Sequence, residues 1–243
     1  MQVIRNVVDE GVLADQSGVF CIGLGKHHWP DFAISSPEAL LAVIGARTKH
    51  IRLASSVTVL SSDDPVRVFE RFSTVNGISN GRAEVILGRD SFTESFPLFG
   101  YDLSDYEILF DDKLDLFAAL LKNEPVTWRG QTRPPLIDQR VFPTIESGTM
   151  KTWIGVGGSP QSVVRAAHYD LPLMLAIIGG DPNRFRPMSI STIGPSHNLA
   201  GRFVKSACTT AVSPKPMKKH ETDSGQTIKR CAIGLAPNVA GRR

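Results

Sequence analysis

The stretch IRLASSVTVLSSDDPVRVFERFSTVNGISNGRAEVILG, residues 51–88, decides the fold class of this 243-residue chain. It opens on a β-rich run over residues 51–60, after which Asp64 and Pro65 begin a helix whose apolar residues recur every three positions. A turn at residues 79–81 then leads into a second apolar run at 83–87. Two strands joined by a crossover helix pair in parallel, so this stretch predicts a β–α–β unit.

The same alternation continues on both sides of this unit. Further helices are expected over residues 2–16, 36–47, 104–121 and 160–168, and further strands over 19–24, 152–156 and 172–178. The helix at 104–121 is expected to begin on a capping box formed by Ser104 and Glu107. Segments rich in Gly and polar residues follow the successive strands, which favours a barrel with a ligand site at its C-terminal face. A doubly wound sheet would also place loops there.

The pattern covers only part of a barrel. No strand pattern precedes the first helix, helix and strand periodicity both vanish after Met188, and an intact (β/α)8 barrel needs about 250 residues. We therefore predict an α/β fold, an incomplete (β/α)8 TIM barrel without its first strand and last strands. Residues 1–188 form the partial barrel, and residues 189–243, with nine Lys/Arg against two Asp/Glu, form a basic, disordered or non-native tail.

Composition argues against several classes of function. The longest apolar run, residues 171–178, is far shorter than the roughly 20 residues that span a bilayer, and no signal peptide is expected. The tail has no basic amphipathic pattern, so neither nucleic acid nor membrane is an expected partner. Three widely spaced cysteines fit a reducing cytoplasm, and no cluster of His, Cys and Asp indicates a metal site. Walker A and dinucleotide-binding glycine motifs are also missing.

Two post-strand segments suit an anion. Gly157 and Gly158 would let the backbone approach a phosphate, while Ser159 and Ser162 could donate hydroxyl groups at the start of a helix. A helix capped after a tight turn is the alternative interpretation. In the segment 88–91, Arg89 offers a guanidinium suited to phosphate, although it could also be a solvated loop residue.

The adjacent histidines His27 and His28 point to opposite sides of an extended backbone. A metal site needs more ligands than one loop histidine provides. An imidazole that faces a bound ligand is the better interpretation of this pair.

Four ordered segments resemble the bacterial luciferase-like flavin-dependent monooxygenases: residues 25–32, 60–69, 88–101 and 176–182. This resemblance implies a barrel, commonly dimeric, that binds reduced flavin at its C-terminal face. It places Gly88, Arg89, Ser91, Gly157, Gly158, Ser159 and Ser162 at the flavin phosphate, and the backbone of Ser55 and Ser56, near a cis peptide, against the flavin ring. His27 and His28 would be the catalytic pair, with Lys26 in a position where the family usually has an acidic residue.

The resemblance implies a flavin-dependent oxidoreductase, a monooxygenase that uses reduced FMN and dioxygen on a small organic substrate. A separate flavin reductase and a homodimer are possible partners. Two alternatives stay open: a reductase of the same fold that uses a deazaflavin, and a catalytically inactive remnant of the barrel.

Overall fold

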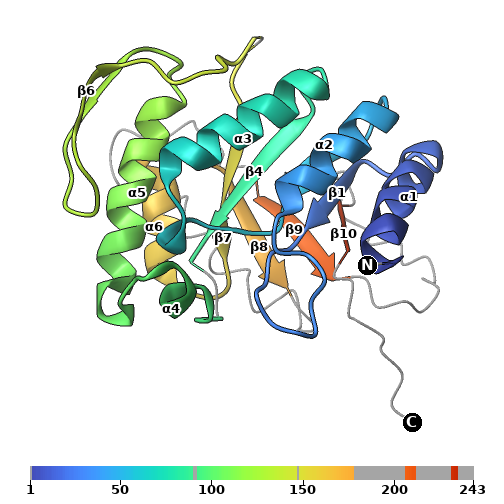
Figure 1. Cartoon of the computed structure of the whole chain (residues 1–243), viewed down its shortest axis with the longest axis horizontal. Helices are drawn as coiled ribbons and strands as arrows, with labels where there is room; N and C mark the ends of the chain where they lie inside the picture. The colour runs from blue at the N-terminus through green and yellow to red at the C-terminus, as the bar shows by residue number, and fades with distance from the viewer. Residues whose placement is uncertain (1, 90–91, 147, 178–205, 212–230, 235–243) are drawn as a thin grey trace.

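The computed structural model describes residues 2–89, 92–146, 148–177, 206–211 and 231–234, the last two segments as backbone only. Helices lie along the outside of a parallel sheet (Figure 1). They are α1 (Gln2–Gln16), α2 (Pro37–Arg47), α3 (Pro65–Ile78), α4 (Ser95–Phe99), α5 (Tyr106–Leu120) and α6 (Pro160–His168), with short 3-10 turns η1 (Leu60–Ser62) and η2 (Leu103–Asp105).

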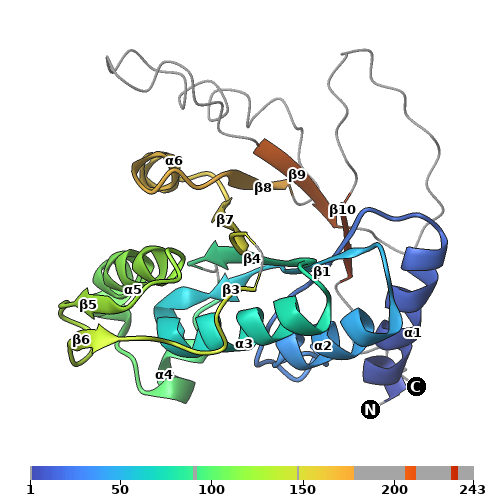
Figure 2. The same cartoon turned by 90° about the horizontal axis from the view of Figure 1, so that it is seen from above.

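The main sheet has eight strands, and all the pairings given for it are parallel. They are β1 (Cys21–Leu24), β2 (Arg52–Ser55), β3 (Thr58–Val59), β4 (Ala83–Gly88), β7 (Lys151–Val156), β8 (Leu173–Ile177), β9 (Ser206–Ala211) and β10 (Cys231–Gly234). The strand order is β2-β1-β10-β9-β8-β7-β4-β3, and β2 also pairs with β4, so the sheet curls back on itself. The curl is visible from above (Figure 2).

The predicted incomplete barrel is confirmed. Within the described residues the chain starts on α1, and β3 pairs only with the end of β4, which leaves the ring of strands short of the eight in a full barrel. Strands β9 and β10 differ from the expectation that strand structure is lost after Met188. They pair between β8 and β1, where the backbone groups of two strand edges would otherwise be exposed. The sequence did not predict them because neither strand contains a run of large aliphatic residues. The division of the chain at residue 188 stays a prediction.

Two other local expectations differ. The predicted strand at 51–60 divides into β2 and β3, separated by a cis peptide bond between Ser56 and Val57. The predicted capping box is wrong: α5 begins after η2, its N-cap Asp105 makes no side-chain capping bond, and the Ser104 backbone N–H donates to Asp102 instead. The connection after α5 contains an antiparallel pair, β5 (Val126–Trp128) and β6 (Leu136–Gln139), that the sequence did not predict.

Alternating strand residues build two apolar layers. One set packs against the surrounding helices and forms the large core, in which the aromatic rings of Phe69 on α3 and Phe117 on α5 lie 6.4 Å apart. The opposite set, which includes Cys21, Ile86 and Trp153, forms a smaller cluster of its own. This alternation fixes the register, so the segments after β1, β2, β4 and β7 emerge together at the C-terminal end of the sheet.

Candidate active site at the C-terminal end of the sheet

His27 lies in the loop after β1 and is held from several sides. Its backbone N–H donates to the Ile34 carbonyl oxygen at 3.1 Å, which closes the loop. Its ring packs against Phe32, with centroids 4.2 Å apart, and meets Phe92 in an edge arrangement at 4.6 Å. Ring nitrogen Nδ1 lies 3.4 Å from Glu94 Oε1. The imidazole therefore has apolar neighbours and one carboxylate contact.

Glu94 contacts both histidines. Besides the ring of His27, the same oxygen accepts the backbone N–H of His28 at 3.3 Å, and the side chain is 12% exposed. Burial raises its pKa, but hydrogen bonds from its own backbone, the His28 backbone and the side chains of Trp29 and His27 outweigh this, so the pKa of Glu94 is lowered. Glu94 is therefore ionised at neutral pH.

His28 occupies a different environment from its neighbour. Its ring meets Phe99 edge-on at 5.2 Å, and its Nε2 atom is buried without a hydrogen-bond partner in the described structure. Burial lowers the pKa of His28, and the positive charge of Lys26 lowers it further. His28 is therefore neutral at pH 7 and can offer one ring nitrogen to a ligand.

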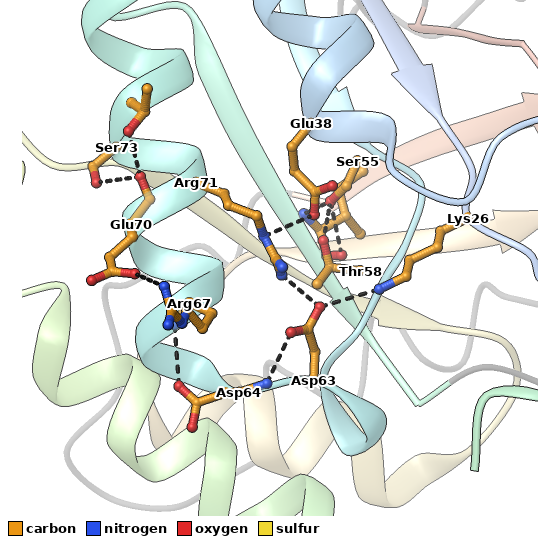
Figure 3. A network of polar contacts seen from close by, with 12 residues as sticks. Lys26, Glu38, Ser55, Thr58, Asp63, Asp64, Arg67, Glu70, Arg71 and Ser73 are labelled. Carbon is orange, nitrogen blue, oxygen red and sulfur yellow. Dashed lines mark hydrogen bonds and ion pairs between the residues drawn. The ribbon is translucent and has the colours of Figure 1, made fainter. Parts of the chain in front are cut away.

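Lys26, in the loop after β1, belongs to a network of four charges with Glu38 on α2, Asp63 after η1 and Arg71 on α3 (Figure 3). Its ammonium lies 3.2 Å from Asp63 Oδ2, and the same oxygen accepts from Arg71 Nη2 at 2.5 Å. Arg71 also faces Glu38, with Nε to Oε1 at 3.5 Å. Two cations and two carboxylates thus balance one another, and Lys26 is directed to Asp63, its nearest carboxylate in this network.

Ser55, the last residue of β2, and Ser56, the residue after it, have mostly structural contacts. The Ser55 hydroxyl donates to the Ile86 carbonyl at 3.3 Å, accepts the Ile86 N–H at 3.1 Å and accepts from Thr58 Oγ1 at 2.9 Å. The Ser56 N–H donates to the Leu24 carbonyl at 2.7 Å. The structure thus gives Ser55 a role in joining β2 to β4, and the cis bond that follows Ser56 agrees with the one implied by the resemblance.

Gly88 ends β4 and has a steric reason to be glycine. A Cβ atom added there would lie 2.5 Å from Val57 Cγ2, closer than real contacts allow. The predicted contact of Gly88 with a flavin phosphate stays a prediction, and predicted site residue Ser91 lies outside the described residues.

The structure brings Arg89 and the start of α6 together. Arg89 Nη2 lies 3.5 Å from the Ser162 hydroxyl oxygen, and Ser162 is 4% exposed. Ser159 is the N-cap of α6, but its hydroxyl donates to Gln161 Oε1 at 2.7 Å and makes no capping bond to the helix backbone. An added Cβ at Gly157 or Gly158 would meet no atom within 4 Å. This corner, made of Arg89, Gly157, Gly158 and Ser162, therefore combines a cation, a hydroxyl, the N-terminal end of a helix and open space.

A carboxylate already contacts the guanidinium of Arg89. Glu107, from the first turn of α5, pairs with Arg89 through Oε1 and with Arg165 through Oε2, the latter at 2.6 Å. Arg165 also pairs with Asp111. Burial raises the pKa of Glu107, but Arg165 and Arg89 outweigh this and lower it overall. The positive charges of Arg89 and Arg165 are therefore already paired with two carboxylates at this corner.

Sequence reasoning named the histidines, Arg89 and the serines as candidates, but it did not indicate their contacts Glu94, Asp63, Glu107 and Arg165. The missed residues contact the site across 18 to 67 positions of sequence, and no local pattern marks such pairs.

Among the described residues, no group of three or more His, Cys, Asp or Glu could hold a metal ion, and no helix is both long and apolar enough to cross a membrane.

Comparison with known sequences gives one family. The sequence model of the luciferase-like monooxygenases matches residues 1–188. An uncharacterized protein of Sinorhizobium fredii is 29% identical over 161 residues, which is 65% of this chain and 45% of that protein. The 4-hydroxyprotoasukamycin monooxygenase of Streptomyces nodosus subsp. asukaensis is 32% identical over 115 residues, 46% of this chain and 31% of that enzyme. The chain thus spans less than half the length of these two relatives.

Solved structures share the fold. Monooxygenase RslO1 from Streptomyces bottropensis has a TM-score of 0.74 at 20% identity, covering 86% of this chain and 64% of that one. The oxygenating constituent of 3,6-diketocamphane monooxygenase from Pseudomonas putida, solved with FMN, has a TM-score of 0.71 at 16% identity, with 86% and 61% covered. An F420-dependent secondary alcohol dehydrogenase has a TM-score of 0.68 at 16% identity, with 85% and 64% covered.

Proposed function

The chain belongs to the luciferase-like monooxygenase family, and we propose that it forms the flavin site of an oxidoreductase that uses reduced FMN and dioxygen on a small organic substrate. The observation that carries this proposal is the 3.5 Å approach of Arg89 to Ser162 at the start of α6. The reduced flavin would supply the electrons for dioxygen, while the residues of this chain would bind and orient the flavin and shield it from water.

The corner at α6 has the chemistry that a phosphate monoester needs. A guanidinium presents several N–H donors in a plane, and the first-turn N–H groups of a helix add a partial positive charge. The open backbone at Gly157 and Gly158 leaves space for the phosphate oxygen atoms. Since the Glu107 carboxylate already accepts hydrogen bonds from Arg89 and Arg165, a phosphate would share or replace that contact.

The histidine loop suits the ring of the flavin. His27 and His28 are surrounded by Phe32, Phe92 and Phe99, which keep water away and strengthen polar contacts there. The connection after β4 reaches both places, because it begins at Arg89 and continues to Phe92 and Glu94 beside His27. A ligand with a phosphate at one end and a planar ring at the other fits this arrangement.

The two cofactor classes are separated by direct binding. The full chain is titrated with FMN and, separately, with the deazaflavin F420, and flavin fluorescence is followed at equilibrium. We expect saturable quenching by FMN, and about 10- to 100-fold weaker FMN binding in Arg89→Met, as befits the loss of one charged hydrogen-bonding partner. Arg129→Met is the matched control, because it removes an exposed arginine that is not one of the candidate site residues.

Other outcomes have clear meanings. Saturable binding of F420 without FMN binding would replace the proposed cofactor by a deazaflavin, as in the dehydrogenase that shares the fold. Binding of neither, together with no saturable oxidation of reduced FMN, would favour an inactive remnant of the barrel. Saturable oxidation of reduced FMN in air, stimulated by a substrate, is the expected activity of the intact site.

A further inference from the structure

Glu94 has contacts that set it apart from the other carboxylates near the histidines. We propose that Glu94 is the positioning residue of His27: it holds the imidazole in one orientation, with the proton on Nδ1, so that Nε2 is the nitrogen that accepts a proton during the reaction. This inference rests on the proposed function, since it assigns a role to the same site.

The first support is geometric. Glu94 Oε1 lies 3.4 Å from His27 Nδ1 and accepts the His28 N–H at 3.3 Å, so one carboxylate oxygen fixes a side chain and the backbone that follows it. Phe92, two residues earlier on the same connection, meets the His27 ring edge-on. Phe32 packs on the ring as well, at 4.2 Å. The ring is therefore confined by packing, and the nitrogen that faces Glu94 is Nδ1.

The second support is the balance of charge. The charged groups that act on the neighbouring His28 are Lys26, Glu94, His27 and Asp63. Asp63 is committed to Lys26 and to Arg71, at 3.2 and 2.5 Å. Glu94 is thus the carboxylate in direct contact with the pair. A carboxylate accepts hydrogen bonds and cannot donate them while ionised, so it favours the tautomer with a hydrogen atom on Nδ1.

The consequence for proton transfer follows directly. With Nδ1–H directed to Glu94, the lone pair of neutral His27 is on Nε2. A proton that leaves a substrate or solvent molecule would bond to Nε2, and the resulting imidazolium would keep its Nδ1–H contact with the Glu94 carboxylate. Return of the proton from Nε2 restores the neutral ring, so Glu94 itself stays ionised throughout.

The tautomer can be measured without any flavin. Nitrogen-15 chemical shifts and long-range nitrogen–hydrogen couplings of the histidine rings are recorded for the full chain at a pH where His27 is neutral, with His27→Gln used to assign the signals. We expect Nδ1–H to dominate in the wild type and to lose its majority to Nε2–H in Glu94→Ala. Glu94→Asp should restore part of it, and Glu124→Ala, an exposed carboxylate outside the site, should change nothing.

Activity provides a second readout. Glu94→Ala is expected to lower kcat by up to about 100-fold, the loss that misplacing a catalytic group can cause, while the Kd for FMN changes less than twofold. If Glu94→Ala does not fold, Glu94→Gln keeps the shape without the charge and should shift the tautomer in the same direction. An unchanged tautomer in the folded variants would overturn the proposal. Failure to bind flavin would contradict the proposed function and leave the tautomer result to decide this one.

Discussion

Replacing Gly88 by alanine tests how closely β4 approaches the chain after β2. The added Cβ would lie 2.5 Å from Val57 Cγ2 and 3.0 Å from Val57 Cβ. Contacts this short force one of the two segments to move, and the cost of such overpacking is about 1–3 kcal/mol. We therefore expect Gly88→Ala to lower the free energy of unfolding by that amount.

A double-mutant cycle in urea separates this clash from other effects. Val57→Ala removes both γ-methyl groups, so in the double variant the added methyl at position 88 no longer meets Cγ2. The two changes should couple favourably by about 1 kcal/mol or more. Gly77→Ala is the matched control, because a Cβ there meets nothing within 4 Å and alanine favours a helix. Additive effects of the substitutions at 57 and 88, within about 0.5 kcal/mol, would refute the reasoning.

Three further predictions concern stability. Asp64→Ala removes the side chain that caps α3, accepting two backbone N–H groups, and should lower the free energy of unfolding by about 1 kcal/mol in urea titrations. Glu84→Gln removes the buried charge that pairs with Arg52 and Lys151, while the amide oxygen can still accept from the Trp153 indole, so a loss of about 1–2 kcal/mol is expected by the same assay. Burial lowers the pKa of Lys113 from 10.5 to about 8, so the unfolded chain binds more protons between these values. Stability should accordingly rise from pH 8 to 10.5, and this rise should be missing in Lys113→Met when the two proteins are compared by denaturation at each pH.

The sequence predicted what depends on local patterns. Helix α6 occupies the predicted residues 160–168 because a Pro in its first turn and amphipathic spacing are both local signals. Helix α5 begins two residues later than predicted, because Asp102 rather than Ser104 makes the side-chain bond at this end. The loop positions of His27 and Arg89 followed from the strand pattern in the same way.

Partners that are distant in sequence were beyond such reasoning. Glu94 meets His27 across 67 positions, and a glutamate in a loop carries no local mark of that contact. A lysine on a helix such as α5 is expected to be exposed, yet Lys113 is 2% exposed and donates to the Ser61 carbonyl oxygen at 2.6 Å. Such residues are placed by the curl of the sheet and the packing of its helices, which single-sequence periodicity does not encode.

The most direct test of the flavin site compares FMN with riboflavin, which has the same ring and no phosphate, on the wild type and on Arg89→Met. If the phosphate lies against Arg89 and the start of α6, wild type should prefer FMN, and the substitution should remove most of that preference while riboflavin affinity stays within about twofold. An FMN preference that survives the loss of Arg89 would place the phosphate elsewhere and contradict the account.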